Sequence, residues 1–483
     1  MVWFHGGAYI LGTASQSEFD PMVLAVVGDV IIVNVNYRLG VFGFLTTGGD
    51  DEGKGNYGML DQVLALEWIN KNIKAFGGDS SKVTIFGESA GAASVHLHLL
   101  SPLSRNLFSQ GIMQSGSGLC GWAVELDTEK AIEDAMSVGR NLNCSYQSSK
   151  ELLTCLRTKT TAELLEVQRQ IITQAINVIP FVPIVDGDFL TDKPATLVEH
   201  GNFKSANILI GNNKDEGTLW AMRAYPLYVP LPEAPEMLLP EFQEVFPEYV
   251  YWYKDPHTTD AIEQQYLDWT KVDDASADHF QSFVEMTTDQ TFACPASDVA
   301  RAHVLKGDNV YRYEMTHVPS KSVYTLSRRL GPKWLGATHG EDLQYMFGWG
   351  FNDAFKSRYG NIQNDEEKTM SVQFMKYWAN FANYGDPNGV SNLTSTYPSW
   401  PKFTVPELEY KELSIEMENG RALRADGCSF WRNYVPRLSA FTGKLSDLEK
   451  DWRNSYYSWK YDDMPEWTTN FNDYKNQNEC TKP

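Results

Sequence analysis

The sequence predicts an α/β fold in which a mostly parallel central sheet carries helices on both faces. β-Branched runs typical of buried parallel strands alternate with helical segments along the first hundred residues. Such an alternation builds right-handed strand–helix–strand units, which assemble into a parallel sheet. The 483 residues, 42% of them hydrophobic, are enough for a large globular core.

The individual elements follow from local patterns. Strands are expected at residues 1–4, 30–33, 83–86 and 208–211. Apolar residues at helical spacing predict a helix from about Leu60 to Trp68, and Gly77-Gly78 closes that segment. No Gly/Ser-rich or Pro-rich linker divides the chain before residue 440, so we predict one domain over 1–444 and a separate tail over 445–483.

Charge and hydropathy restrict the partners. The chain has 41 Lys+Arg against 62 Asp+Glu, a formal charge of −21, which disfavours nucleic acid and anionic membranes and favours neutral or cationic small ligands. Solubility alone explains the acidity equally well. No uninterrupted apolar run reaches the length of about 18 residues that a transmembrane helix needs.

The six cysteines form no C-x-x-C pair and no zinc-type cluster with histidine, so neither a metal centre nor a cofactor is expected. Cys144 and Cys155 bracket a short polar loop, as a local disulfide of a secreted protein would. Asn143 and Asn392 begin glycosylation sequons. Together these features favour a secreted or extracellular protein.

The strongest chemical motif is Gly87-Glu88-Ser89-Ala90-Gly91, a G-x-S-x-G sequence directly after a predicted strand. In this context the flanking glycines allow a sharp turn that exposes the Ser89 hydroxyl as a nucleophile. The N–H of Ala90, at the start of the next helix, can stabilise an oxyanion. The glycine loop that follows the first strand supplies two more candidate donors, Gly7 and Ala8.

A catalytic serine needs a histidine base and an acid that orients it, in the chain order serine, acid, histidine. Asp215 and Glu216 both follow the predicted strand at 208–211, and spacing cannot choose between them. His339 is the favoured base, because its loop lies between apolar segments. The other downstream histidines are His257, His279, His303 and His317.

Several stretches resemble the cholinesterase/carboxylesterase (type-B) family of α/β hydrolases, over nearly the whole chain. They are NYRLGVFGF at 36–44, GNYGMLDQ at 55–62, FGGD at 76–79, FGESAG at 86–91 and NKDEG at 213–217. The resemblance implies the α/β-hydrolase fold and a triad of Ser89, Glu216 and His339.

The same resemblance implies the disulfides Cys144–Cys155 and Cys294–Cys428, with Cys120 an unpaired thiol. Members of the family carry a further region before the strand that opens this chain. That region holds a signal peptide, outer strands and the choline-binding tryptophan. The domain is therefore expected to be N-terminally incomplete, with an unpaired sheet edge.

The family comparison also implies where substrate binds. Asn177 and Ile179 stand where acetylcholine-selective relatives have phenylalanines, and with Phe181 they predict an acyl pocket that admits butyryl or larger groups. Glu88 resembles a carboxylate that helps to hold a quaternary ammonium. The remaining predicted contacts with substrate are Leu219, Trp220 and Glu341.

Two of these positions depart from choline-specific relatives. Leu219 replaces an aromatic residue, although Trp220 follows it, and Glu341 replaces a tyrosine. Fewer cation–π contacts would weaken choline binding. We therefore predict a choline esterase with a broad or butyryl-type pocket. The alternatives are a general carboxylesterase without choline preference and, in another class, a non-catalytic neuroligin-like adhesion module.

The tail combines a capping-box sequence at 446–449 with aromatic residues spaced i, i+4 and i+7. They are Trp452, Tyr456, Trp459, Trp467, Phe471 and Tyr474. With Cys480 they resemble the tetramerisation tail of cholinesterases, which implies a homo-oligomer with an interchain disulfide. A proline-rich anchor peptide could tether it at the cell surface or synapse. Pro465 should kink the helix, and docking on the chain's own surface is the alternative.

Overall fold

The computed structural model describes the chain except residues 49–51, 145–146, 175–178, 225–233, 251–252, 254, 323–331, 391–397, 443–446 and 477–483. Within the described residues an eight-stranded sheet runs in the order β2-β1-β3-β4-β5-β6-β7-β8. Its strands are β1 (Val2–Phe4), β2 (Val33–Val35), β3 (Thr84–Glu88), β4 (Gln110–Gln114), β5 (Ile208–Asn213), β6 (Val310–Met315), β7 (Glu409–Leu413) and β8 (Asn419–Arg421). All neighbours are parallel except β7 and β8, so the predicted fold is confirmed.

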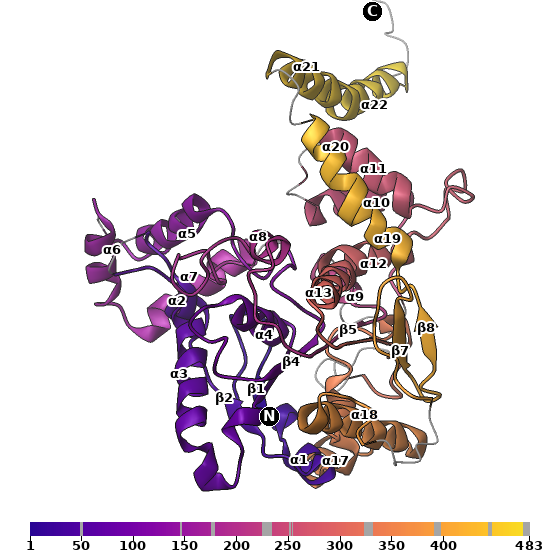
Figure 1. Cartoon of the computed structure of the whole chain (residues 1–483). Helices are drawn as coiled ribbons and strands as arrows, with labels where there is room; N and C mark the ends of the chain where they lie inside the picture. The colour runs from indigo at the N-terminus through magenta and orange to yellow at the C-terminus, as the bar shows by residue number, and fades with distance from the viewer. Residues whose placement is uncertain are drawn as a thin grey trace, which may run out of the picture.

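Helices surround this sheet (Figure 1). Those before β5 are α1 (Met22–Gly28), α2 (Gly40–Phe44), α3 (Tyr57–Asn72), α4 (Ala90–Leu100), α5 (Thr128–Asn141), α6 (Ser149–Leu156), α7 (Thr161–Gln174) and α8 (Pro194–Glu199). Between β5 and β7 lie α9 (Thr218–Ala224), α10 (Leu239–Tyr249), α11 (Pro256–Tyr266), α12 (Phe280–Thr288), α13 (Cys294–Leu305), α15 (Pro332–Leu335), α16 (Leu343–Met346), α17 (Asp353–Tyr359) and α18 (Asp365–Tyr384). After β8 come α19 (Ala425–Ser429), α20 (Val435–Thr442), α21 (Asp447–Ser458) and α22 (Met464–Asn476).

The described residues also form shorter helical turns. The 3₁₀ turns are η1 (Ser17–Phe19), η2 (Ile73–Phe76), η3 (Ser80–Lys82) and η5 (Trp349–Phe351). The π-helical turns are η4 (Asp289–Ala293), η6 (Phe430–Tyr434) and η7 (Trp459–Asp463). The turn η4 connects α12 directly to α13 and lies close to the candidate site.

The part of the core that packs on the sheet forms two layers, one on each face, because successive strand residues point to opposite faces. A further large cluster contains Trp122, Trp220 and Phe292. Along β3, Phe86 belongs to the cluster formed with α16 and α18, whereas Ile85 belongs to the cluster formed with α3, α4 and α13. Leu209 and Ile210 of β5 divide in the same way. The helices on both faces hold the carboxyl ends of the central strands in place.

The predicted helix beginning near Leu60 is present as α3, which continues through η2 to Gly77, where φ is +84°. Of its predicted apolar positions Val63 is buried, whereas Leu64 and Trp68 are exposed. The predicted strand at 30–33 is displaced to β2, which lies at one edge of the sheet formed by the described residues.

Both implied disulfides are present. Cys144 and Cys155 are bonded, as are Cys294 and Cys428, and Cys120 is a buried free thiol. The first bond ties α5 to α6, and the second ties the start of α13 to α19. No helix among the described residues has both the length and the apolar character needed to cross a bilayer.

The tail helices α21 and α22 lie beyond α20, far from the sheet (Figure 1). The aromatic stripe predicted there is exposed at 43–74% for Trp452, Tyr456, Trp459, Trp467, Phe471 and Tyr474. Tyr457, which is not part of the stripe, has its hydroxyl 3.4 Å from His257 Nδ1. The stripe therefore does not dock on the catalytic body. Pro465 lies in the first turn of α22, directly after η7. Ser446 and Cys480 fall outside the described residues.

Candidate active site

Ser89 occupies a strained turn between β3 and α4, with φ of 56° and ψ of −123°. The turn is possible because the chains on either side approach very closely. A Cβ on Gly91 would lie 2.0 Å from the Phe4 carbonyl oxygen, and one on Gly87 would lie 2.4 Å from the Gly91 carbonyl carbon. The flanking glycines thus allow the serine to project from the carboxyl edge of the sheet.

The loop after β1 lies against this turn, since a Cβ on Gly6 would be 3.1 Å from the Ser89 Cβ. Its next residues have positive φ: +109° at Gly7, 54° at Ala8 and 59° at Tyr9. Among the described residues the N–H groups of Gly7, Ala8 and Ala90 donate no hydrogen bond. The predicted donors are therefore on a strained loop beside the serine, with their N–H groups available to an incoming oxygen.

The two candidate acids have different hydrogen-bond partners. Glu216, which is fully buried after β5, accepts a hydrogen bond from His339 Nδ1 at 2.6 Å. Its other oxygen accepts the Asn213 N–H at 2.7 Å, which fixes the carboxylate. Asp215 instead accepts the Ala337 N–H at 2.9 Å and so supports the loop that leads to His339.

The remaining histidines have other surroundings. His303 contacts Asp308 and His317 contacts Glu367, while His279 precedes α12 and His257 faces the tail. His339 alone among the five downstream histidines is held by the predicted acid.

Glu88 also reaches His339 and is itself buried. Its Oε1 lies 3.1 Å from His339 Nε2, as an ion pair rather than an aligned hydrogen bond. Burial raises the pKa of Glu88 above its ordinary value. Burial alone would lower the pKa of His339, but the carboxylates of Glu88 and Glu216 together raise it. The imidazole is therefore stabilised as a cation by carboxylates at both ring nitrogens.

A third buried carboxylate, Asp342, was not predicted. Gln114 Nε2 donates to its Oδ2 at 2.7 Å, and Trp378 Nε1 donates to Gln114 Oε1 at 3.0 Å. Burial raises the pKa of Asp342 to about 6, and the charge of Glu216 adds to this effect. Asp342 follows His339 by three residues, but a lone Asp in a loop carries no sequence signal of this role.

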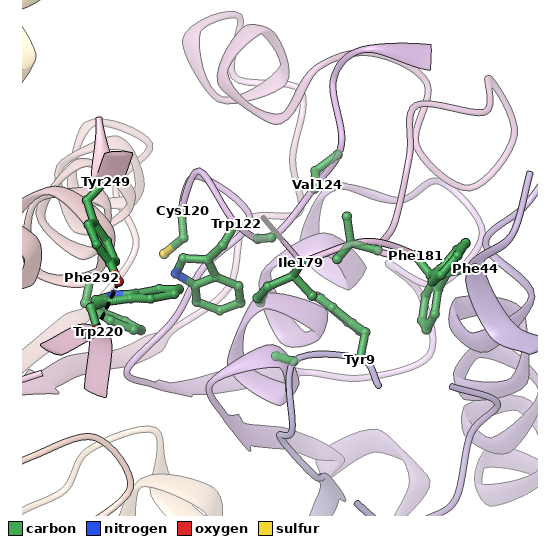
Figure 2. Close-up of a cluster of buried hydrophobic side chains, with 14 of the residues drawn as sticks. Tyr9, Phe44, Cys120, Trp122, Val124, Ile179, Phe181, Trp220, Tyr249 and Phe292 are labelled. Carbon is green, nitrogen blue, oxygen red and sulfur yellow. Dashed lines mark hydrogen bonds between the residues drawn. The ribbon is translucent and has the colours of Figure 1, made fainter. Parts of the chain in front are cut away.

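An aromatic side chain also contacts the imidazole, and it belongs to a cluster with two tryptophans, Trp122 and Trp220 (Figure 2). The Phe292 ring centroid lies 4.8 Å from that of His339, 5.8 Å from that of Trp122 and 6.5 Å from that of Trp220. All three aromatic residues are buried. An apolar wall therefore stands beside the reacting groups.

Comparison with known proteins shows the family of the chain. The model of the carboxylesterase family matches residues 1–431. The chain is 33% identical to an acetylcholinesterase of Bungarus fasciatus over the whole chain and 76% of that protein. It is 37% identical to a cholinesterase of Mus musculus over the whole chain and 77% of that protein.

The chain belongs to the carboxylesterase family. It is a carboxylic ester hydrolase of the serine-esterase type, and the eight-stranded sheet is that of an α/β hydrolase. Within the described residues this esterase has no group of three metal-ligating side chains.

Some of the predicted substrate contacts of the esterase lie at the aromatic wall, and others lie farther from it. Trp220, after Leu219 at the start of α9, lies in the aromatic wall, and Ile179 lies on the Trp122 side of the cluster (Figure 2). Phe181 lies farther away, toward Phe44. Asn177 falls outside the described residues.

Glu341 of the esterase is fully buried and hydrogen-bonded away from the catalytic pair. Its carboxylate accepts from the Ser322 hydroxyl and from Gln344 Nε2, the latter at 2.8 Å. These contacts fix the side chain beside the His339 loop.

Sequence reasoning missed Trp122 and Phe292, the two residues that complete the aromatic wall. Each is a single aromatic residue in a segment without a recognisable spacing. Trp122 directly follows Gly121 in a loop, and Phe292 lies in the π-helical turn η4. Only the tertiary fold brings them together.

Proposed function

We propose that this esterase hydrolyses choline esters through an acyl-enzyme, with Ser89 as the nucleophile. Ser89 Oγ attacks the ester carbonyl carbon while His339 Nε2 takes its proton. The alcohol leaves with that proton, and water then attacks the acyl-enzyme in the same way. The observation that carries the proposal is the 2.6 Å contact of His339 with Glu216, on the edge of the sheet where the Ser89 turn lies.

The site contains groups that can stabilise both charges formed in the reaction, the positive charge of the imidazolium and the negative charge of the oxyanion. Glu216 stabilises the imidazolium and holds its Nδ1–H away from Nε2. The N–H groups of Gly7, Ala8 and Ala90 would bind the oxyanion on the tetrahedral carbon, because none of them is hydrogen-bonded within the described part of the chain. Preorganised donors of this kind typically contribute about 10²–10³ in turnover each.

A cationic alcohol group fits the electrostatics. Glu88 and Asp342 are buried carboxylates within the site, and the whole chain carries a formal charge of −21. The two relatives compared are an acetylcholinesterase and a cholinesterase. A negative field can raise the on-rate of a cationic substrate by about 10–10³.

The acyl side is proposed to be of the broad or butyryl type. Ile179 is smaller than the phenylalanine expected in an acetyl-selective pocket, and it lies on the Trp122 side of the aromatic cluster. Each additional methylene that fits an apolar pocket favours binding by about 10-fold or more.

A comparison of four esters tests both parts of the proposal. Acetylthiocholine and butyrylthiocholine compare acyl groups, 3,3-dimethylbutyl thioacetate removes only the cationic charge, and 4-nitrophenyl butyrate is a neutral aryl ester. We expect Ser89-dependent turnover of both choline esters, with butyryl preferred, and kcat/KM for the neutral isostere lower by about 10-fold or more. Ser89→Ala is the control in every assay.

Leu219 supports a second candidate, a general carboxylesterase, since an aliphatic residue adds no cation–π contact next to the catalytic acid. Equal kcat/KM for acetylthiocholine and its neutral isostere would support this candidate and contradict the choline preference. Activity that survives in Ser89→Ala would contradict the whole mechanism.

We further propose that residues 445–483 are an assembly tail of a secreted homo-oligomer. Its exposed aromatic stripe is typical of a helix that packs against other chains, here around a proline-rich peptide. The two disulfides fit an oxidising compartment. Light scattering of the chain with and without residues 445–483 tests this. We expect oligomers only with the tail, and Cys480→Ser should abolish covalent dimers on non-reducing gels.

A further inference from the structure

The π-helical turn η4 (Asp289–Ala293) is fixed at both ends. At its start Asp289 pairs with Arg424 at 2.8 Å and accepts a hydrogen bond from Tyr266 at 2.9 Å. Directly after its end, Cys294 is bonded to Cys428 of α19. A π turn inside an α-helix frequently marks a functional site, because it moves side chains out of the regular helical register.

Between these anchors, Thr291 holds both tryptophans of the aromatic wall. Trp122 Nε1 donates to the Thr291 carbonyl oxygen at 3.1 Å, and Trp220 Nε1 donates to Thr291 Oγ1 at 3.0 Å. The hydroxyl in turn donates to the Thr287 carbonyl within the helix. Two indoles from distant parts of the chain therefore meet on one residue, and each buried N–H has an acceptor.

Phe292, the residue after Thr291, contacts His339, the proposed catalytic base. The two ring centroids lie 4.8 Å apart, and the Phe292 centroid lies 5.8 Å from that of Trp122. Phe292 and Trp122 belong to the same aromatic cluster (Figure 2). Tyr249 secures the far side, since its hydroxyl donates to the Trp220 carbonyl at 3.1 Å. Displacement of Trp220 would therefore change the apolar surface beside the reacting serine and histidine.

We propose that Thr291 is a positioning residue that sets acyl-group specificity, by holding Trp122 and Trp220 at a fixed separation across Phe292. This inference rests on the proposed function, in which the acyl group of the ester lies against this wall. The side-chain hydroxyl controls Trp220, whereas the main-chain carbonyl controls Trp122. Substitution of Thr291 therefore releases one tryptophan and leaves the other in place.

Thr291→Val tests the proposal because valine keeps the shape and removes the acceptor. The Trp220 N–H is then buried without a partner, so the indole moves to find one and the wall opens. We expect the ratio of kcat/KM for butyrylthiocholine to that for acetylthiocholine to rise by about 10-fold, mainly through the acetyl ester. Thr291→Ser retains the hydroxyl and should leave the ratio within about 2-fold of the parent.

A double-mutant cycle separates this role from a general structural one. Trp220→Phe removes the indole N–H, so Thr291→Val should change the acyl ratio in the parent and not in the Trp220→Phe background. Thr287→Val is the matched control, because within the described part of the chain the Thr287 hydroxyl donates to carbonyls of its own helix, those of Phe283 and Val284. It should leave the ratio unchanged.

The outcomes distinguish the inference from the proposed function. Ser89-dependent hydrolysis with an acyl ratio that Thr291→Val does not alter would overturn the inference alone. The same would follow if Thr287→Val shifted the ratio equally, or if the two substitutions were additive. Absence of Ser89-dependent hydrolysis in the parent would overturn the proposed function, and the inference with it.

Discussion

Glu88 Oε1 lies 3.1 Å from His339 Nε2, the nitrogen that accepts the serine proton in the proposed mechanism. The residue before the nucleophile and the acid after β5 thus contact opposite nitrogens of one imidazole. Glu216 orients the ring, whereas Glu88 favours its protonated form. Both carboxylates therefore raise the pKa of His339, Glu88 through its charge and Glu216 through its charge and its hydrogen bond.

Substitution of Glu88 should change the pH dependence of catalysis. The carboxylates of Glu88 and Glu216 together raise the pKa of His339 against the opposing effect of burial. Glu88→Gln removes one of them, so the pKa falls and the neutral base becomes available at lower pH. We expect the acid limb of kcat/KM to move to lower pH by about 1 unit. Glu88→Asp retains the charge and serves as control; a limb that stays or moves upward contradicts the assignment.

Glu216 and its neighbour should differ sharply in their effect on turnover. Glu216→Gln leaves the His339 Nδ1–H without its carboxylate, and we expect kcat to fall by about 10³–10⁴ with little change in KM. Asp215→Asn weakens only the support of the loop before His339, through its contact with Ala337, and should reduce kcat about 10-fold or less. Steady-state kinetics of both variants tests this prediction. Equal decreases in kcat would show that the assignment of Glu216 as the acid is wrong.

The glycines of the serine turn should tolerate no Cβ. Gly91→Ala places a carbon 2.0 Å from the Phe4 carbonyl oxygen, a contact that only backbone movement can relieve. We expect a loss of about 3 kcal/mol or more in the free energy of unfolding. Gly77→Ala is the control, because nothing lies within 4 Å of its Cβ and only its φ of +84° is unfavourable. It should lose about 1 kcal/mol in urea unfolding.

The two disulfides should contribute unequally to stability. Cys294–Cys428 spans a sequence separation of 134 and Cys144–Cys155 one of 11. By chain entropy alone their removal should lower the free energy of unfolding by about 5 and about 3 kcal/mol. Paired Cys→Ala variants compared by urea unfolding check the order. A larger loss from the Cys144–Cys155 pair would indicate that native contacts, rather than loop length, dominate.

The strands β4, β6, β7 and β8 and the order of the strands in the sheet were not predicted, because strand pairing is a long-range property. The strands expected from local apolar and β-branched runs form at β1, β3 and β5. The exception is the strand expected at 30–33. Val33 pairs with Val2, the first residue of β1, so residues 30–32 have no neighbouring strand in the described structure and β2 begins at Val33. A β-branched run predicts the tendency to form a strand, and the partner determines its limits.

The residues of the candidate site are also predictable only in part from the sequence. Ser89, Gly7 and Ala8 lie in motifs with a local geometric cause, and the sequence alone indicates them. The choice of Glu216 over Asp215 depends on which carboxylate faces the His339 loop, more than a hundred positions away. The contacts of Thr291 with two tryptophans have no sequence spacing at all, because they arise only when α9, η4 and the Trp122 loop meet.

The π turn η4 also makes α12 and α13 two helices of different phase within one continuous helical segment from 280 to 305. A deletion of one residue between 289 and 293 would restore a regular α-helix and rotate one half against the other by about 100°. Phe292 could then face His339, or Cys294 could face Cys428, but not both. The length of this short turn is consequently as strict a requirement as the identity of any residue in it, and homologous chains should vary in its composition before they vary in its length.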